Sequence, residues 1–318
     1  MDRRPGSRED VRLLSDLEPV VAKALDAHLR NAEDWYPHEY VPWSEGANFD
    51  GVLGGLAWEP GQQRLSDAAR DGLLHNLLSE DNLPSYHRVI AELFSLDGAW
   101  GTWVHRWTVE EGRHGMAIRD YLLVTRSADP VALERDRSAH VQNGYEIDYR
   151  GDVLASLVYV TLQELGTRIS YRNIRRLCDE PTCAAMLRRI ARDENHHMLF
   201  YRTVLAAAME RDPDRTVRAL ADVVDTIRRP GHGAPGFGGL ARSMARSGIY
   251  TPVTHHDEVL LPVVRFLRVF EATGLGPDGE QARNRLSRLL DHSARQALRF
   301  AHLQERIARL PAGTAARP

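Results

Sequence analysis

The sequence predicts an all-α protein built on a four-helix bundle with additional helices. Apolar residues recur at the spacing of amphipathic helices through most of the 318 residues, and the alternation typical of strands is weak. Long helical segments also carry a twice-repeated arrangement of glutamate and histidine. Helices that each bring polar side chains to one place are typical of a bundle with a site in its core.

Eight segments have the length and periodicity of helices. They cover residues 8–30, 66–95, 99–125, 150–178, 182–211, 214–228, 255–273 and 279–309. Segments 31–65 and 126–148 carry Pro, Gly and polar clusters, which are typical of loops. The stretch "RRPGHGAPGFGGLARSMARSGIYTP" is also expected to be a loop. We expect one domain over residues 1–318, with the bundle at about 66–211 and C-terminal helices at about 214–309.

Composition and charge argue against several classes of protein. Hydrophobic residues make up 43%, and no apolar run reaches the roughly 18 residues that span a bilayer, so no membrane span is expected. The charged N-terminal stretch lacks the apolar centre of a signal peptide, which predicts a cytoplasmic location. A net charge of -3 gives no indication of nucleic-acid binding. Cys178 and Cys183 are too few for a disulfide framework, and we expect them to be buried.

Two copies of Glu-x-x-His stand out, in "EEGRHG" and "DENHHM", and each follows another glutamate by 31 or 30 positions. The residues concerned are Glu80, Glu111, His114, Glu164, Glu194 and His197. Positions i and i+3 share one face of a helix, so each copy presents a carboxylate and an imidazole to one point. Four carboxylates and two imidazoles in a bundle core suit two adjacent iron or manganese ions, because four buried acids without metal would be costly.

The second copy contains adjacent histidines, His196 and His197. Glu194 and His197 have the i, i+3 spacing, whereas Glu194 and His196 do not, so we expect His197 to be the ligand. His196 is expected to face a neighbouring helix or the solvent. About one Glu-x-x-His is expected by chance in a chain of this length, so one copy alone could be a solvated helix face. Two copies at matched distances favour the two-metal site.

Four motifs resemble those of the soluble acyl-carrier-protein desaturases, the plant stearoyl type with bacterial relatives. "EEGRHG" is similar to the family's Glu-Glu-Asn-Arg-His-Gly, and "DENHHM" to its Asp-Glu-Lys-Arg-His-Glu. "SEDNLPSY" resembles its Thr-Glu-Glu-Ala-Leu-Pro-Thr-Tyr, and "LQELGTRIS" its Phe-Gln-Glu-Arg-Ala-Thr-Phe-Ile-Ser. With weaker likeness in "GIYTPVTHHDEVL" and "TGLGPDGEQA", the resemblance extends from about residue 10 to 300.

The resemblance implies a ferritin-like fold in which the six residues bind two iron ions per chain. Glu111 and Glu194 would be the carboxylates that bridge the irons. The chain departs from the family pattern beside this site, because His196 replaces an arginine and Met198 replaces a glutamate. These departures leave the implied ligand set intact, but they bear on the redox properties of the centre and on the outcome of its reaction.

The resemblance also assigns roles to three residues around the ligands. Thr167 matches the family's threonine beside the oxygen-binding face, where a hydroxyl can donate a hydrogen bond or relay protons. It could instead be a helix threonine that donates to its own backbone. Asp193 would accept a hydrogen bond from the free ring nitrogen of His114. Trp35 matches the tryptophan of a Trp-Asp-His chain from the surface to the metal, although a packing tryptophan is the alternative.

The implied enzyme is an oxygen-dependent di-iron desaturase that introduces a double bond into an acyl chain on acyl carrier protein. The resemblance further implies a homodimer and a ferredoxin-type electron donor. The arginine-rich segments "RNIRRL" and "RNRLSRLLDHSARQALR" could dock the acidic carrier, or could be ordinary solvated helix faces.

Three alternatives to the desaturase stay open. A hydroxylase or N-oxygenase of a specialised biosynthetic pathway could use the same centre. An iron-oxidising protein of the ferritin type could use similar ligands. A relative that has lost its metal could bind carriers alone. The sequence gives neither the acyl chain length nor the position of the double bond.

Overall fold

The computed structural model describes residues 7–144, 152–227 and 236–309, and within them the only β pairing is a bridge between Phe49 and Leu56. The α-helices are α1 (Arg8–Asn31), α2 (Asp67–Glu80), α3 (Leu83–Phe94), α4 (Gly98–Val124), α5 (Pro130–Asn143), α6 (Val153–Arg176), α7 (Pro181–Arg211), α8 (Pro213–Thr226), α9 (Phe237–Arg246), α10 (Pro252–Thr254), α11 (Leu261–Phe266) and α12 (Pro277–Ala308). A π-helix, η4 (His255–Leu260), joins α10 to α11. Short 3-10 helices are η1 (Pro37–Tyr40), η2 (Trp43–Glu45), η3 (Pro60–Gln62) and η5 (Val269–Glu271).

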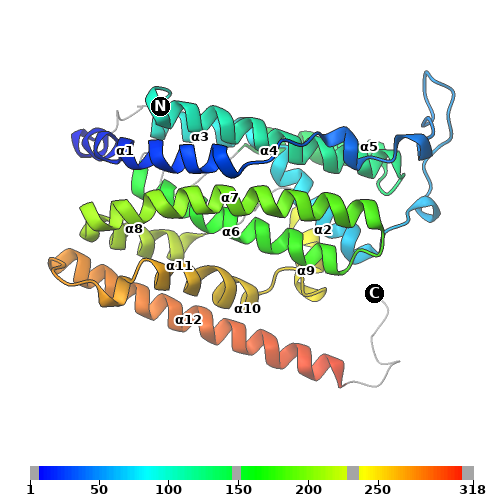
Figure 1. The fold of residues 1–318 in the computed structure, drawn as a ribbon. Coiled ribbons are helices and arrows are strands. Elements are labelled where there is room, and N and C mark those ends of the chain that lie inside the picture. The colour runs from blue at the N-terminus through cyan, green and yellow to red at the C-terminus, as the bar shows by residue number, and fades with distance from the viewer. Residues whose placement is uncertain (1–6, 145–151, 228–235, 310–318) are drawn as a thin grey trace.

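The long helices lie roughly alongside one another (Figure 1). Helices α6 and α7 are neighbours over most of their length, and α1 packs against both α4 and α7. On the other side of the molecule, α12 packs against α8 and α10. None of the described helices is long and apolar enough to cross a membrane.

Acidic residues followed by proline begin three of the helices. Asp129, Glu180 and Asp212 each accept hydrogen bonds from backbone N–H groups in the first turn of α5, α7 and α8. The proline that follows each acid has no N–H to leave unpaired, so it suits the first helical position. These pairs separate α6 from α7 and α7 from α8, so α7, which carries Glu194 and His197, begins and ends at defined points.

The prediction of one continuous helix over residues 66–95 is wrong. The chain forms α2 and α3 instead, with Asp81 and Asn82 between them. Pro84 lies in the first turn of α3, where a missing N–H is tolerated, whereas inside a continuous helix it would remove a hydrogen bond. Glu80 is consequently the last residue of α2.

Two segments predicted to be loops contain helices. Segment 126–148 holds α5, whose Asp129-Pro130 start is a helix signal, and the glycine-rich stretch after α8 holds α9. The predicted helix 255–273 is interrupted, because its chain passes through η4, α11 and η5. Residues 145–151 and 228–235, which include the expected start of a helix at 150 and the end of another at 228, lie outside the described residues. Cys178 and Cys183 are buried, as expected.

A polar layer crosses the bundle between two clusters of buried apolar side chains. One cluster contains Trp100 to Trp107 of α4 and Met198 to Met209 of α7, and the other contains Ala117 to Leu122 of α4 and Cys183 to Ala191 of α7. Between them, both helices carry titratable side chains that are buried. The apolar clusters on either side fix the helix positions and exclude water from this layer.

Candidate metal centre

The six predicted ligands meet in the polar layer as two groups. The first group contains Glu80, Glu111, His114 and Glu194, and the second contains Glu111, Glu164, Glu194 and His197. Within each group, one ligand atom from every side chain lies within 4.8 Å of the others. Glu80 is the most exposed of the six, at 9%. Glu111 and Glu194 belong to both groups, so their carboxylates are placed where two cations could share them.

The histidine of the first group turns one ring nitrogen toward three carboxylates. His114 Nδ1 lies 3.5 Å from Glu111 Oε2, 3.5 Å from Glu194 Oε1 and 3.9 Å from Glu80 Oε2. These distances exceed those of good hydrogen bonds. The lone pairs of the four side chains therefore point toward one space without closing on one another.

The second group has the same form around His197. Its Nδ1 lies 2.7 Å from Glu111 Oε1 and 3.5 Å from Glu164 Oε2. Although the shorter distance suits a hydrogen bond, its angles do not, and Nδ1 has no hydrogen-bond partner among the described residues. A nitrogen that faces carboxylates without donating to them has the orientation of a ligand atom.

The donor set fits a pair of cations. Within the described chain, His114 Nδ1, His197 Nδ1, Glu111 Oε1 and Glu194 Oε1 are buried without a hydrogen-bond partner. Such atoms are rare, because each costs the desolvation of a polar group. Carboxylate oxygens and imidazole nitrogens together suit iron, manganese or zinc. A cation in each group would accept the lone pairs and neutralise the carboxylates.

Electrostatics in the metal-free site show the same need for positive charge. Burial, together with the nearby charge of Glu111, raises the pKa of Glu80 and of Glu164 well above the usual range. Burial opposes the charged form of His114 and His197, but neighbouring carboxylates outweigh it and raise the pKa of both imidazoles. The site therefore holds protons in the places where metal ions would supply positive charge.

Hydrogen-bond donors hold the carboxylates that belong to only one group. The Tyr171 hydroxyl donates to Glu80 Oε1, and Trp107 Nε1 donates to Glu164 Oε1 at 2.9 Å. Neither donor was predicted from the sequence. In both carboxylates, one oxygen accepts the hydrogen bond from the protein, and the other oxygen is available to a cation.

A set of side chains behind each ligand histidine, on the side away from the ligand groups, is called here an outer arm. The first outer arm lies behind His114 and contains Asp193 and Trp35, the two residues predicted there, together with Arg189. Trp35 Nε1 donates to Asp193 Oδ2 at 2.6 Å, and the Trp35 and His114 rings stack with centroids 6.3 Å apart. His114 Nε2 lies 3.5 Å from Asp193 Oδ2, longer than a good hydrogen bond. Arg189 donates to Asp193 Oδ1 and to the backbone oxygen of Glu33. Trp35, Asp193 and His114 thus lie in the predicted order, but the predicted hydrogen bond to Asp193 is not formed, because His114 Nε2 has no hydrogen-bond partner among the described residues.

A second outer arm, which was not predicted from the sequence, supports His197. His197 Nε2 lies 2.9 Å from Glu110 Oε2 and, because a carboxylate only accepts, the proton is on Nε2. Glu110 Oε1 accepts hydrogen bonds from His28 Nε2 at 3.2 Å and from Arg106 Nε at 2.5 Å, and His28 Nε2 also lies 2.9 Å from Oε2. Burial favours the neutral form of Glu110, but hydrogen bonds from His197 and His28 outweigh it and lower its pKa well below the usual range.

The two arms reveal a longer repeat than Glu-x-x-His. Arg106 precedes Glu110 by four positions and Arg189 precedes Asp193 by four, so Arg-x-x-x-acid-Glu-x-x-His occurs twice. The arms cross, because the acid on α4 contacts the histidine on α7, and the acid on α7 lies beside the histidine on α4. This longer pattern was the sequence signal for Glu110. His28 had no comparable signal.

His196 lies outside both groups. Its ring makes an edge contact with His28 of α1, with centroids 6.0 Å apart. The side chain is half-buried, and burial, with the neighbouring His28, lowers its pKa. His196 therefore faces a neighbouring helix, which was one of the two orientations expected from the spacing.

Thr167 lies within reach of three acceptors. Its hydroxyl is 2.8 Å from Glu194 Oε2, 3.1 Å from the backbone oxygen of Glu164 and 3.2 Å from that of Gln163. Both interpretations of this residue thus have a matching contact, with the helix backbone and with a shared carboxylate. The contact with Glu194 is the shortest and involves the stronger acceptor.

Comparison with known proteins places the chain in a family. The family model described as fatty acid desaturase matches residues 9–312. The chain belongs to the fatty acid desaturase family. It is 45% identical over 285 residues to DesA1 of Mycobacterium tuberculosis, a protein assigned as an acyl-[acyl-carrier-protein] desaturase, covering 87% of this chain and 84% of DesA1. It is 28% identical over 301 residues to the chloroplastic stearoyl-[acyl-carrier-protein] 9-desaturase of Spinacia oleracea, covering 87% of this chain and 73% of the spinach protein.

A solved structure has the same architecture. The X-ray structure of DesA2 from Mycobacterium tuberculosis H37Rv, assigned as an acyl-ACP desaturase, superposes with a TM-score of 0.68 at 29% sequence identity. The match covers 85% of this chain and 99% of that one. The predicted all-α, ferritin-like fold is therefore confirmed for this desaturase, while its organisation as a single domain stays a prediction.

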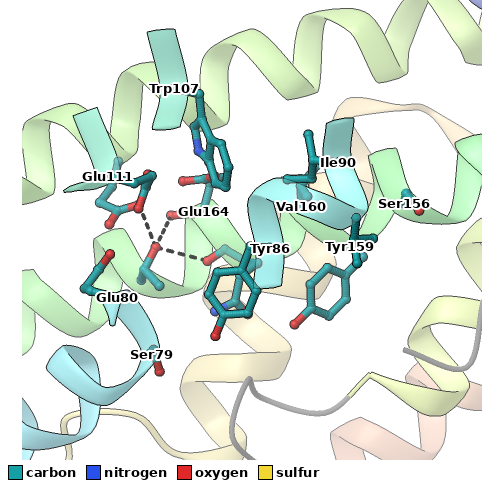
Figure 2. Close-up of a pocket in the computed structure, with 14 residues that line it drawn as sticks. Ser79, Glu80, Tyr86, Ile90, Trp107, Glu111, Ser156, Tyr159, Val160 and Glu164 are labelled. Atoms are coloured by element: carbon teal, nitrogen blue, oxygen red, sulfur yellow. Dashed lines mark hydrogen bonds between the residues drawn. The ribbon is translucent and has the colours of Figure 1, made fainter. Parts of the chain in front are cut away.

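In this member of the desaturase family, a pocket adjoins the ligand groups (Figure 2). The residues that line it are Ser79, Glu80, Tyr86, Val89, Ile90, Trp107, Glu111, Ser156, Tyr159, Val160, Gln163, Glu164, Thr167 and Glu194. The carboxylates of Glu80, Glu111 and Glu164 gather at one end, and Ile90 and Val160 lie toward the other. The pocket therefore brings an apolar wall and the candidate metal ligands to the same space.

Proposed function

We propose that this protein introduces a double bond into an acyl chain carried on acyl carrier protein, using two iron ions held by the two ligand groups. The observation that carries the proposal is the pair of ligand groups sharing Glu111 and Glu194, which opens onto a pocket with apolar walls in a member of the desaturase family. When bound, the irons would supply the oxygen chemistry that removes hydrogen from unactivated methylenes. The balanced reaction takes up oxygen, two electrons and two protons, and yields an alkene and two waters.

The chain's own residues would hold the centre and keep it in place. Glu80 and His114 would bind one iron, Glu164 and His197 would bind the other, and the two shared carboxylates would bind both. Tyr171 and Trp107 direct the unshared carboxylates, and the two outer arms direct the histidines. Fixed donors of this kind keep both positions in the geometry that the reaction needs.

The pocket would position the acyl chain. Methylenes have no polar group to bind, so the choice of carbon pair must come from shape and depth. Ile90 and Val160 provide apolar contacts, and Trp107, which donates to Glu164, lines the same pocket. The Thr167 hydroxyl lines the same pocket and donates to Glu194 Oε2, so it is placed to hold or move a proton beside that carboxylate.

The partners and location follow from the family rather than from the geometry. We propose an acidic acyl carrier protein as the substrate carrier, a ferredoxin-type electron donor, a homodimer and a cytoplasmic location. Exposed arginines in "RNIRRL" at the end of α6 and in the later part of "RNRLSRLLDHSARQALR" on α12 support docking of an acidic carrier. Arg283 and Arg285 of the second segment are instead paired with Glu280 and with Asp222 and Asp225.

Oxygen-18 labelling tests the reaction directly. Reduced protein would be supplied with labelled oxygen and a panel of acyl carrier proteins with different acyl chains, and the products located by mass spectrometry. We expect an alkene without label. A labelled alcohol or N-oxide as the main product would instead assign an oxygenase, and iron oxidation without any change of the acyl chain would assign a protein of the ferritin type.

Metal affinity should rise with pH. Glu80, Glu164, His114 and His197 all have raised pKa values in the metal-free site, so they hold protons that a metal ion must displace. Each proton displaced should strengthen binding about tenfold per pH unit below the pKa concerned. Titration with Fe(II) between about pH 6 and about pH 8 would measure this, and an affinity independent of pH would contradict it.

Turnover on the carrier should weaken as salt rises. Exposed charges are screened over about 8 Å at physiological ionic strength, so docking through surface arginines should lose strength when salt is added. The corresponding free acids and coenzyme A thioesters should be poorer substrates. Initial rates with all three at several salt concentrations would measure this, and equal rates unaffected by salt would contradict docking by charge.

A further inference from the structure

The two histidine ligands differ in the groups that end their outer arms. The arm behind His114 ends at Trp35, and the arm behind His197 ends at His28. We infer that His28 is a positioning residue for the second metal position, and that it acts through Glu110 to hold His197 in the orientation that binds metal. This inference rests on the proposed function, because it assigns a role toward the metal ions proposed there.

Burial and contacts give His28 a fixed place. It is 6% exposed in α1, its ring stacks on His197 with centroids 5.9 Å apart, and its edge meets Trp103 at 5.1 Å. Its Nε2 makes a hydrogen bond with Glu110 Oε1 at 3.2 Å and lies 2.9 Å from Glu110 Oε2. Since that carboxylate only accepts, the His28 proton is on Nε2 and the bond is a donation to Glu110.

Glu110 connects His28 to the ligand. Glu110 Oε2 accepts from His197 Nε2 at 2.9 Å, and Glu110 Oε1 accepts from His28 Nε2 at 3.2 Å. Because the Nε2 proton is donated to Glu110, Nδ1 is the nitrogen left to bind a metal ion once any proton on it is displaced, and Nδ1 faces Glu111 and Glu164. The carboxylate therefore selects the tautomer and direction of the ligand, and His28 fixes the carboxylate.

The two arms have matching parts, and the comparison gives His28 a counterpart in the arm behind His114. In each arm, an arginine four positions before the acid binds the carboxylate oxygen that does not face the ligand histidine. Arg189 binds Asp193 in this way, and Arg106 binds Glu110. A second donor from α1 or the segment after it completes the arm and stacks on the ligand ring, Trp35 in one case and His28 in the other. His28 thus occupies, for His197, the place that Trp35 occupies for His114.

Two substitutions separate a hydrogen-bonding role from a packing role. His28→Phe keeps a flat ring against Trp103 and His197 but removes the donor. His28→Gln places an amide N–H at about the position of Nε2 and restores the donor. Loss of an outer hydrogen bond of this kind typically costs about 10- to 100-fold in metal affinity. We therefore expect His28→Phe to weaken binding of one Fe(II) by about that factor, and His28→Gln to recover most of it.

The position affected is the second expected result. Anomalous diffraction from iron in crystals of the variants reports the occupancy of each position separately. At limiting iron, His28→Phe should deplete the position beside His197 and spare the position beside His114, and Trp35→Phe should do the reverse. His140→Phe replaces a histidine of α5 that is also buried but belongs to neither arm, and this variant should fill both positions normally.

Each outcome of the experiment decides something. Wild-type protein that binds no pair of iron ions would contradict the proposed function itself. If the wild type binds two ions and His28→Phe binds them equally well, the inference about His28 fails and the function stands. Equal depletion of both positions, or failure of His28→Gln to restore binding, would also overturn it. Should His28→Phe not fold, as judged by circular dichroism, His28→Leu against His28→Gln gives the same comparison.

Discussion

Replacing His197 with alanine is expected to leave about one tightly bound iron per chain, whereas replacing His196 is expected to leave about two. His197 Nδ1 faces Glu111 and Glu164, and its ring is fully buried, so no neighbouring side chain has a nitrogen in the same place. His196 contacts His28 at the helix surface and lies outside both ligand groups. A missing imidazole ligand removes a direct bond to the metal, which no hydrogen bond from a neighbour replaces.

Iron content measured by mass spectrometry of the purified variants would decide between the two histidines. Circular dichroism spectra should match the wild type in both, because an alanine in the middle of α7 is a good helix former. Normal iron in His197→Ala with depleted iron in His196→Ala would show that His196, and not His197, is the metal ligand.

Helical spacing predicts much of the centre because its residues lie on regular helices. On α4 and α7, the positions i and i+3 point to one side wherever the helix is unbroken, so Glu111 with His114 and Glu194 with His197 could be paired from their spacing alone. Helix α6 is also unbroken around Glu164. These three helices meet at one polar layer, as a bundle with a site in its core requires.

The interruptions of the helices could not be read from apolar periodicity alone. Pro84 lies in the first turn of α3, and Asp129-Pro130 begins α5. Both are local signals for the start of a helix, and apolar periodicity does not detect them. Helix α9 follows a glycine-rich stretch that carries no helical signal of its own. Each of these elements depends on packing against the bundle, and propensity is a weak guide where packing decides.

Glu110 and His28, which act through another residue, were not predicted from the sequence, whereas Asp193 and Trp35 were expected from the resemblance. Glu110 is adjacent to a ligand, and an acid stands at the same place in both copies of the motif, but the partner of Glu110 on α7 depends on how α4 and α7 face one another. His28 lies 82 positions before Glu110, and no spacing rule joins them. Contacts between distant segments are set by tertiary packing, and these are the contacts that orient the ligands.

Replacing Thr167 with alanine is expected to keep both irons but to uncouple oxygen consumption from formation of the double bond by about tenfold. The hydroxyl lies 2.8 Å from Glu194 Oε2 and lines the pocket, so it is placed to deliver a proton beside the shared carboxylate. Desaturation must withdraw a second hydrogen before the first carbon radical receives oxygen, and it therefore depends on timely proton delivery. Without the hydroxyl, reduced oxygen should leave as hydrogen peroxide or water while less alkene forms.

The matched control lies on the same helix. Thr161 is fully buried, and its hydroxyl donates to the backbone oxygen of Leu157 at 2.7 Å, which is the contact of an ordinary helix threonine. Thr161→Ala should therefore keep its coupling, and Thr167→Ser, which restores a hydroxyl, should regain most of it. The measurement is the ratio of alkene formed to oxygen consumed, with iron content determined in the same samples. A wild-type ratio in Thr167→Ala would mean that the bonds to the Gln163 and Glu164 carbonyls, rather than the bond to Glu194, account for this threonine.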